Sequence, residues 1–335
     1  MSIPLEASFW LSEYITPWDL YAHGITRVLA QQKTPFQQMS IVESGAYGKA
    51  LILDGKWQSC TGDEFLYHEG LVHPAMIMDR LGVPPNQPPN QPQDQPRRVL
   101  VLGGGEGATL REVLRWRSVE QVVMVDIDGA VVESCRQHLP EMHQGAFDDP
   151  RTTMVIEDAI AFVARWRESV SRAEAPLWDV IISDLSDPIE SGPAFPLFTQ
   201  EHFEDLKHIL SPRGVLALQA GPTAPAEMHL HTRLVRTLST VFSFTLPYTC
   251  YAMSFGSPLG FVLASMQPLS ARPDCDAVDR LLASDVAGEL RAVDGMALLG
   301  MLNIPRHLRR AIAAETQIYT MNAPPKPLGR GVMES

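Results

Sequence analysis

A glycine-rich stretch at residues 102–110, LGGGEGATL, follows an apolar run and contains one carboxylate, Glu106. Its core, GGGEGA at 103–108, fits the G-x-G-x-x-G/A pattern of nucleotide-binding turns. Asp126 follows Glu106 by twenty residues, a distance at which an acidic residue can take two ribose hydroxyls. A pyrophosphate would be repelled by Glu106, whereas a ligand amine would be attracted. The stretch therefore favours a sulfonium nucleoside, which has an amine and no phosphate, and leaves a dinucleotide oxidoreductase as the second class.

Further carboxylates follow other apolar runs of the chain. Asp184 and Asp187 stand three residues apart in WDVIISDLSDP, directly before Pro188. Two neighbouring carboxylates suit a polycationic amine better than an amide or a nucleobase. Asp187 could instead cap a turn before the proline, a role that suits Asp184 less well. Two earlier runs end in the pairs Asp126 with Asp128 and Glu157 with Asp158.

The apolar runs themselves predict buried strands. They are RRVLVLGGG, QVVMVDID, TTMVIED, WDVIISDLSDP and GVLALQAG, and segments of helical character lie between them. This alternation predicts an α/β fold with a doubly wound, Rossmann-like and mainly parallel sheet of the methyltransferase type. Ligands of such sheets lie at the carboxyl ends of the strands, so the glycine stretch and the carboxylates should meet in one crevice.

Other elements surround the expected sheet. Residues 36–60 predict a small N-terminal antiparallel sheet, and residues 63–81 have the apolar spacing of a helix. The runs at 245–255 and 259–265 predict a closing antiparallel pair of strands. We expect an N-terminal β-strand domain at 1–62, a catalytic domain at 63–265 that includes a Pro/Gln-rich linker at 82–96, and a helical C-terminal extension at 266–335.

Composition narrows the class of partner. The chain has 335 residues and a formal net charge of −12, which argues against broad nucleic-acid binding and is compatible with a cationic substrate. No apolar run is long enough to span a membrane, and the N-terminus lacks the pattern of a signal peptide, so we expect a cytoplasmic protein. The four cysteines have no paired spacing and predict neither disulfides nor a zinc site.

The histidines of the expected helix at 63–81 resemble a metal motif only at first sight. His68 and His73 flank a glutamate as in the zinc helix H-E-x-x-H, but they are five residues apart and not four. At that spacing they face different sides of a helix, so we expect no metal site and a structural role for His73.

Several motifs, taken together, resemble a known family. FQQMSI, LDGKWQSCTGDEFLYHE, GGGEGA, VDID, EDA and DLSDP followed by GP occur in this order through nearly the whole chain. They are similar to the motifs of polyamine aminopropyltransferases, the spermidine synthase family. DEFLYHEGLVHP, LSPRGVLALQAGP and the tail GELRAVDG with AAETQIYT look most like those of thermospermine synthases.

The resemblance implies a reaction and its partners. The aminopropyl group of decarboxylated S-adenosylmethionine, a co-substrate, would move to spermidine or putrescine, and 5'-methylthioadenosine would leave. No permanently bound cofactor and no metal would be needed, because a sulfonium is already a good leaving group. The family also implies a homodimer or a homotetramer. Two alternatives stay open, a methyltransferase that uses S-adenosylmethionine and a non-catalytic polyamine-binding protein.

The resemblance also implies roles for individual residues. Asp126 would take the ribose, Asp158 the adenine amino group, and Glu106 the aminopropyl amine. Asp184 would be the general base, and Tyr67 would share or position the proton. The implied donor site consists of Gln37, Gly103, Gly105, Glu106, Asp126, Asp158, Ala159 and Pro193. The implied acceptor site consists of Gln58, Tyr67, His68, Glu106, Asp184 and Asp187.

Proton removal is the demanding part of this chemistry. An aliphatic ammonium has a pKa near about 10.4 and a free Asp near about 3.9, a gap that corresponds to about 9 kcal/mol. Burial narrows the gap by raising the pKa of the carboxyl and lowering that of the amine. We therefore expect Asp184 in partly dry surroundings and a turnover that rises toward alkaline pH.

The identity of the amine acceptor stays open. Spermidine synthases often have a tyrosine in the loop that reads YAMSFGSPLG here, and counting back from GFVLAS places Ser254 at that point. A smaller side chain would close less tightly on a short diamine, which favours spermidine as acceptor. Putrescine and agmatine remain alternatives.

Overall fold

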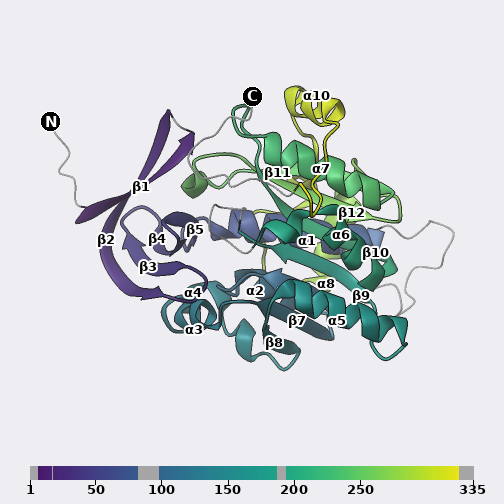
Figure 1. Cartoon of the computed structure of the whole chain (residues 1–335), viewed down its shortest axis with the longest axis horizontal. Coiled ribbons are helices and arrows are strands. Elements are labelled where there is room, and N and C mark those ends of the chain that lie inside the picture. The colour runs from purple at the N-terminus through teal and green to yellow at the C-terminus, as the bar shows by residue number, and fades with distance from the viewer. Residues whose placement is uncertain (1–6, 17, 82–97, 187–193, 324–335) are drawn as a thin grey trace.

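The computed structural model describes residues 7–16, 18–81, 98–186 and 194–323, which form two sheets and the helices that cover them (Figure 1). The first sheet is antiparallel and has the strand order β1-β2-β3-β4-β5. Its strands are β1 (Phe9–Thr16), β2 (Asp19–Lys33), β3 (Gln38–Ser44), β4 (Gly48–Leu53) and β5 (Lys56–Cys60). The expectation of strands within residues 36–60 is met by β3 to β5, whereas β1 and β2 lie in the expected β-strand domain at 1–62, where no individual strand was predicted before residue 36.

The second sheet has seven strands in the order β11-β12-β10-β9-β6-β7-β8. Its first five strands along the chain pair in parallel, and β12 runs antiparallel to both β10 and β11, as the sequence predicts. The strands are β6 (Arg98–Gly103), β7 (Gln121–Asp126), β8 (Thr152–Ile156), β9 (Trp178–Asp184), β10 (Leu210–Pro222), β11 (Phe244–Cys250) and β12 (Leu259–Ser265). The predicted Rossmann-like fold with a small antiparallel sheet before it is confirmed.

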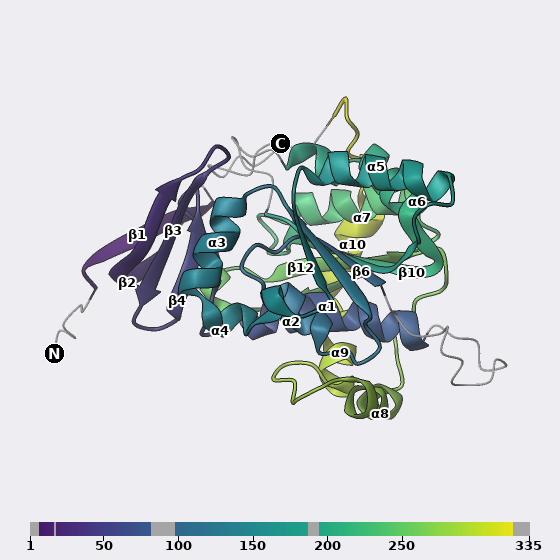
Figure 2. The same ribbon diagram turned by 90° about the horizontal axis from the view of Figure 1, so that it is seen from below.

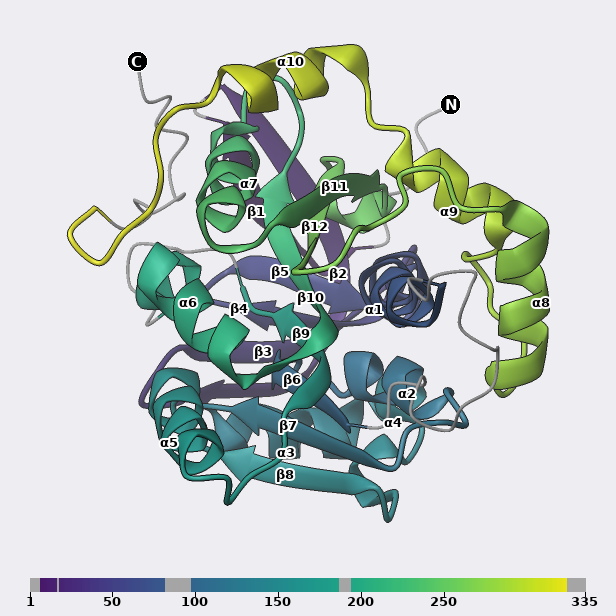
Figure 3. The ribbon, with the colours of Figure 1, turned by 90° about the vertical axis from the view of Figure 1, so that its right-hand side faces the viewer.

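Helices cover both faces of the seven-stranded sheet (Figure 3). Helices α5, α6 and α7 lie on one face, while α1, α2 and the tail helices α8 and α9 lie on the other. The α-helices are α1 (Glu64–Leu81), α2 (Ala108–Leu114), α3 (Gly129–His138), α4 (Pro140–His143), α5 (Ala159–Ser171), α6 (Gln200–Ile209), α7 (His229–Val241), α8 (Cys275–Asp285), α9 (Gly295–Leu302) and α10 (Arg306–Ala314).

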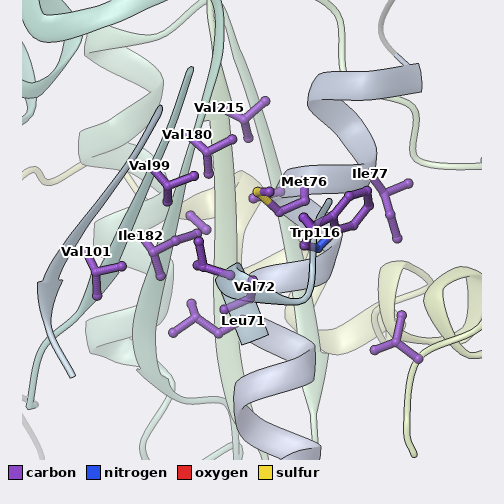
Figure 4. Packing of buried hydrophobic residues seen from close by; sticks show 14 of the residues in the cluster. Leu71, Val72, Met76, Ile77, Val99, Val101, Trp116, Val180, Ile182 and Val215 are labelled. Carbon is purple, nitrogen blue, oxygen red and sulfur yellow. The ribbon is translucent and has the colours of Figure 1, made fainter. Parts of the chain in front are cut away.

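Apolar alternation explains why these strands are buried on both faces. In β6, Val99 and Val101 belong to the cluster that contains α1, whereas Leu100 and Leu102 belong to the cluster on the opposite face. All four are fully buried. Side chains of a strand point alternately to the two faces, so a continuous apolar run fits a strand between two helical layers. Figure 4 shows Leu71, Val72 and Met76 of α1 facing the valines of β6, β9 and β10.

The first sheet is joined to the second through the helices that follow β7. Met39, Ile41 and Leu51 pack with Val131 of α3 and Met142 of α4 in one buried cluster, and Figure 2 shows β3 and β4 beside these helices. This packing brings β5 to the glycine-rich turn after β6, where Ser59 donates to Glu106 at 3.1 Å.

The C-terminal tail contacts α1, and Figure 2 shows the tail helices α8 and α9 beside it. The carboxylate of Glu69, which is 1% exposed, accepts hydrogen bonds of 2.7–3.1 Å from the backbone N–H groups of Arg291, Ala292 and Val293. The Arg291 guanidinium also lies 3.6 Å from the centre of the Phe65 ring. The tail therefore helps to place the helix that carries Tyr67 and His68.

Three further expectations concern the Pro/Gln-rich stretch, the cysteines and membrane spans. The Pro/Gln-rich stretch at 82–96 lies outside the described residues. All four cysteines are free thiols. None of the helices in the described ranges combines the length and the apolar character needed to cross a membrane.

Candidate active site

The site lies where the strand order of the parallel sheet reverses. The chain proceeds from β6 to β7 and β8 on one side and then returns to β9 on the other side of β6. Gly103 at the end of β6 pairs with Asp184 at the end of β9. Ligands of open α/β sheets bind at the carboxyl ends of the strands at this reversal.

The glycine-rich turn allows the two strand ends to approach closely. Gly103 has a φ of 82°, and a Cβ there would lie 2.1 Å from the backbone oxygen of Asp184. Only glycine fits this backbone conformation and this spacing without a shift. The N–H of Gly104 donates to the same Asp184 oxygen at 3.1 Å, so the turn and the end of β9 hold each other in place.

Asp184 is held by two hydroxyl groups. Tyr67 on α1 donates to Asp184 Oδ1 at 2.7 Å, and Thr109 on α2 donates to Asp184 Oδ2 at 2.6 Å. Burial raises the pKa of the Asp184 carboxyl, and the nearby Glu106 charge adds to this effect, while the charge of His68 and both hydroxyls oppose it. A carboxylate with a raised pKa, beside a tyrosine, can accept a proton from a bound amine.

Glu106 lies in the same site but has a charged partner. Its Oε1 lies 3.1 Å from His68 Nε2 and accepts from Ser59 Oγ at 3.1 Å. Burial would raise the pKa of Glu106, but the hydrogen bond and charge of His68 outweigh this and lower it. Glu106 is therefore an ionised carboxylate with 12% of its side chain exposed, suited to attract an ammonium group.

His68 is fully buried behind Glu106 and is flanked by carboxylates on both sides. Its Nδ1 lies 2.8 Å from Glu64 Oε2, and its Nε2 faces Glu106. Each ring nitrogen needs a proton to donate to its carboxylate, so the geometry calls for the doubly protonated imidazolium. Burial disfavours that form, but the hydrogen bonds to Glu106 and Glu64 raise the pKa of His68 to about 10.

A buried ionic network continues from His68 into the core. Arg111 on α2 donates to both oxygens of Glu64, at 3.1 and 2.9 Å, and to Glu112 Oε1 at 2.7 Å. Glu112 Oε2 in turn lies 3.0 Å from His73 Nε2, and Trp116 donates to His73 Nδ1 at 3.0 Å. Each charge has an opposite neighbour, which is the condition for burying ions at acceptable cost. His73 thus belongs to this network, away from the strand ends.

Asp126 ends β7 next to the glycine-rich turn. A Cβ at Gly105 would lie 3.0 Å from Asp126 Oδ2, and burial raises the pKa of Asp126 to about 6. Its Oδ1 accepts from the N–H of Asp128 at 2.8 Å. The Gln37 side chain donates to Asp128 Oδ2 at 3.0 Å. Gln37 is therefore attached to the loop after Asp126 and is not bonded to Asp126 itself.

Asp158 lies at the neighbouring strand end. Glu157 donates its N–H to the backbone oxygen of Asp126 at 3.0 Å, which fixes the end of β8 against the end of β7. Asp158 is exposed and its Oδ1 accepts from the N–H of Ile160 at 2.9 Å, so it caps α5. The following residue, Ala159, is buried with 7% exposure.

Gln58 of β5 reaches the loop after β9 from the other sheet. Its Oε1 accepts from Ser186 Oγ at 3.1 Å, and its Nε2 donates to the backbone oxygen of Lys56 at 3.2 Å. Two other residues implied by the resemblance, Asp187 and Pro193, lie outside the described residues.

Ser254 lies in the loop between β11 and β12. Ser254 is fully buried and donates both its N–H, at 2.9 Å, and its hydroxyl, at 2.8 Å, to Asp63 just before α1. The residue of this loop that meets Tyr67 is Phe255, whose ring stacks on it with centroids 5.7 Å apart. Ser254 therefore anchors the loop, and Phe255 packs against the tyrosine.

The structure adds residues that the sequence reasoning missed. Three of them contact a residue of the site directly: Ser59 contacts Glu106, Glu64 contacts His68, and Thr109 contacts Asp184. The fourth, Arg111, supports the site by binding Glu64. Thr109 and Arg111 lie within three residues of the end of the glycine-rich motif. This closeness to the motif was the sequence feature that could have indicated them as site residues. Within the described ranges, no three His, Cys, Asp or Glu side chains gather as a metal site.

Comparisons with known proteins place this geometry in context. Residues 64–271 match the family model described as the spermine/spermidine synthase domain, and residues 9–60 match that of the spermidine synthase tetramerisation domain. The chain belongs to the spermidine synthase family. It is accordingly an aminopropyltransferase. Segment 9–60 contains the strands of the first sheet, and segment 64–271 contains those of the second sheet.

Relatives and solved structures agree with this membership over almost the full length. A polyamine aminopropyltransferase of Synechococcus sp. strain JA-2-3B'a(2-13) is 57% identical, with 97% of this chain and 99% of that protein covered. One of Aeropyrum pernix is 42% identical, with 93% of each chain covered.

Two crystal structures of family members show the same fold. Spermidine synthase in complex with the transition state analogue AdoDATO matches with a TM-score of 0.78 at 26% identity, over 94% of this chain and 99% of that one. Spermidine synthase from Thermotoga maritima matches with a TM-score of 0.76 at 26% identity, over 94% and 98% of the two chains.

Proposed function

We propose that this aminopropyltransferase moves the aminopropyl group of decarboxylated S-adenosylmethionine to an amine of spermidine or putrescine and releases 5'-methylthioadenosine. The observation that carries the proposal is the pair of differently supported carboxylates at the sheet reversal. Glu106 is kept ionised by His68, and Asp184 has a raised pKa and a tyrosine partner. One suits the attraction of an ammonium and the other the acceptance of its proton.

The donor would lie along the ends of β6, β7 and β8. Asp126 would take the ribose hydroxyls, Asp158 the adenine amino group, and Glu106 the aminopropyl ammonium. Decarboxylation of the donor removes a negative group that these acidic residues would repel. The remaining proposed donor contacts are Gln37, Gly103, Gly105, Ala159 and Pro193.

The transfer itself needs alignment and one proton acceptor. The acceptor nitrogen attacks the propyl carbon bonded to the sulfonium, the N–C bond forms, and the C–S bond breaks. Sulfur keeps the electron pair and leaves as a neutral thioether. The proton of the attacking amine passes to Asp184, with Tyr67 beside it. The residues supply orientation and the proton acceptor, which are the two contributions that such a displacement requires.

The acceptor would approach Asp184 from the side of β5 and α1. Gln58, Tyr67 and Asp187 are its proposed neighbours, and His68 acts through Glu106 because it is fully buried. We propose spermidine as acceptor, as in thermospermine synthases, because Ser254 is anchored to Asp63 and presents no tyrosine at this point. Putrescine is the alternative acceptor.

We further propose a cytoplasmic homodimer or homotetramer assembled through the N-terminal sheet. The strands β1 and β2 expose apolar side chains of the kind that protein interfaces bury. These are Phe9, Trp10, Tyr14, Leu20 and Val28, each 44–58% exposed. The match of residues 9–60 to the family's tetramerisation domain supports this surface as the interface.

Product identification tests the proposed function. The purified chain is incubated with decarboxylated or intact S-adenosylmethionine and with putrescine, spermidine or agmatine, and the products are identified by mass spectrometry. We expect an aminopropylated polyamine and methylthioadenosine with the decarboxylated donor only. A methylated product, or binding without product, would overturn the proposal in favour of a methyltransferase or a binding protein. The relative kcat/KM for spermidine and putrescine decides the acceptor.

A further inference from the structure

Thr109 is one of the two residues whose hydroxyl group donates to Asp184. It is the second residue of α2, directly after the glycine-rich turn, and its side chain is fully buried. Its Oγ1 donates to Asp184 Oδ2 at 2.6 Å, which is among the shorter distances for hydrogen bonds between oxygens. Asp184, which accepts this hydrogen bond, is the carboxylate that the proposed function uses as general base, so the inference rests on that proposal.

The two hydroxyls that hold Asp184 differ in what they can reach. Tyr67 donates to Oδ1 from α1 and keeps 8% of its surface exposed, whereas Thr109 donates to Oδ2 and has none. A Cβ placed on Gly104 would lie 3.1 Å from Oδ2, so the glycine-rich turn also closes over this oxygen. Oδ2 therefore faces the protein interior, and Oδ1 is the oxygen left for a substrate.

We propose that Thr109 is a positioning residue for the general base, whose hydroxyl holds Asp184 Oδ2 so that Oδ1, beside Tyr67, takes the proton from the amine. The hydroxyl orients the carboxylate plane and stabilises its ionised form, since a donated hydrogen bond favours the charged state. In this way Thr109 counteracts burial and the charge of Glu106, which both favour the protonated form of Asp184.

The charged and titratable groups around Asp184 decide how a pH profile would change. They are Tyr67 and His68 on α1, Glu106 in the glycine-rich turn and Asp126 at the end of β7. None of them is altered when the Thr109 hydroxyl is removed. A shift of the profile in a Thr109 variant would then report on Asp184.

Substitution by valine and by serine separates the hydroxyl from the shape of the side chain. Thr109→Val keeps the branched shape of the side chain and removes its hydroxyl, whereas Thr109→Ser keeps the hydroxyl. For Thr109→Val we expect kcat to fall about tenfold or more, as for the loss of a hydrogen bond to a charged group. The ascending limb of the kcat profile should move to higher pH, because Asp184 then holds its proton more tightly. The KM for the donor should stay unchanged, and Thr109→Ser should retain most of the activity.

Each outcome of this experiment decides the inference. An unshifted limb in Thr109→Val, or equal losses in the valine and serine variants, would overturn it. If thermal unfolding shows that Thr109→Val does not fold, Thr109→Ala and Thr109→Ser are compared by the same readouts. The unaltered chain is assayed first with decarboxylated S-adenosylmethionine and spermidine. Failure to form product there would overturn the proposed function, whereas failure in the variants alone would overturn only the role of Thr109.

Discussion

The Glu106 side and the Asp184 side of the site lie at adjacent points of one sheet, yet their surroundings are built differently. Glu106 is backed by His68, Glu64 and Arg111, a row of alternating buried charges. Asp184 is held by the neutral hydroxyls of Tyr67 and Thr109. The hydrogen bond and charge of His68 lower the pKa of Glu106, whereas burial and the charge of Glu106 raise that of Asp184 in spite of its two hydroxyl donors.

Under the proposed function, this difference would let two carboxylates of one site serve two purposes. Ionic support costs a buried charge, but it keeps Glu106 negative in the absence of ligand. Hydroxyl donors orient Asp184 without a direct ion pair, so burial and the charge of Glu106 can still raise its pKa. A carboxylate meant to bind a cation and one meant to exchange a proton need these opposite settings.

The largest effect should come from removing the proton acceptor. Asp184→Asn should lower kcat about 10²- to 10⁴-fold, the usual contribution of a general base. Donor binding, measured by calorimetry, should survive because Glu106 and Asp126 are unchanged. Asp179→Asn is the matched control, since Asp179 lies at the opposite end of the same strand, where it accepts from the N–H of Arg98. Near-normal kcat in Asp184→Asn would remove it from the role of base.

A smaller and different effect is expected on the Glu106 side. Glu106→Gln should raise the KM for the donor roughly tenfold to a hundredfold, as for the loss of a charged hydrogen bond, and should change kcat less. It also leaves His68 with a single carboxylate partner. Glu157→Gln serves as control, because Glu157 lies at a neighbouring strand end but pairs with Arg165. An unchanged KM with a strongly reduced kcat would mean that the two sides do not divide the work as described.

The pH dependence of turnover should show the titration of Asp184 and that of His68 beside Glu106. Asp184 acts only when ionised, and its pKa is raised, so kcat should increase with pH above the ordinary range of an aspartate. His68 supports Glu106 only while protonated, and this support is lost as pH rises through its pKa of about 10. The kcat/KM profile for the donor should therefore rise toward alkaline pH and fall again above about pH 10. A profile that neither rises above the ordinary range of an aspartate nor falls near pH 10 would contradict both assignments.

The sequence was sufficient for the features that depend on local pattern. Apolar runs between helical segments predict the parallel sheet, and the glycine-rich turn with carboxylates at strand ends predicts where the site lies. The strands β1 and β2 were missed because their mixed polar and apolar residues do not form an apolar run, and their apolar side chains are partly exposed.

The partners within the site were harder to predict, because they come from distant segments. His68 faces Glu106 across 38 positions, and Thr109 meets Asp184 across 75. His68 was expected beside the acceptor, but its complete burial between two carboxylates depends on how α1 packs under the glycine-rich turn. The sequence places Ser254 in the loop between β11 and β12, but its hydrogen bonds to Asp63 follow from tertiary contacts that no local pattern encodes.

The central claim, that Glu106 is kept ionised while Asp184 exchanges a proton, can be tested directly by infrared difference spectroscopy during an acid titration. The carboxylic acid band is recorded for the unaltered chain and for Asp184→Asn, Glu106→Gln and Asp126→Asn, so that each band is assigned by its loss. We predict that the Asp184 band grows in at a higher pH than the Glu106 band. Protonation of Glu106 before Asp184 as the pH falls would contradict the account.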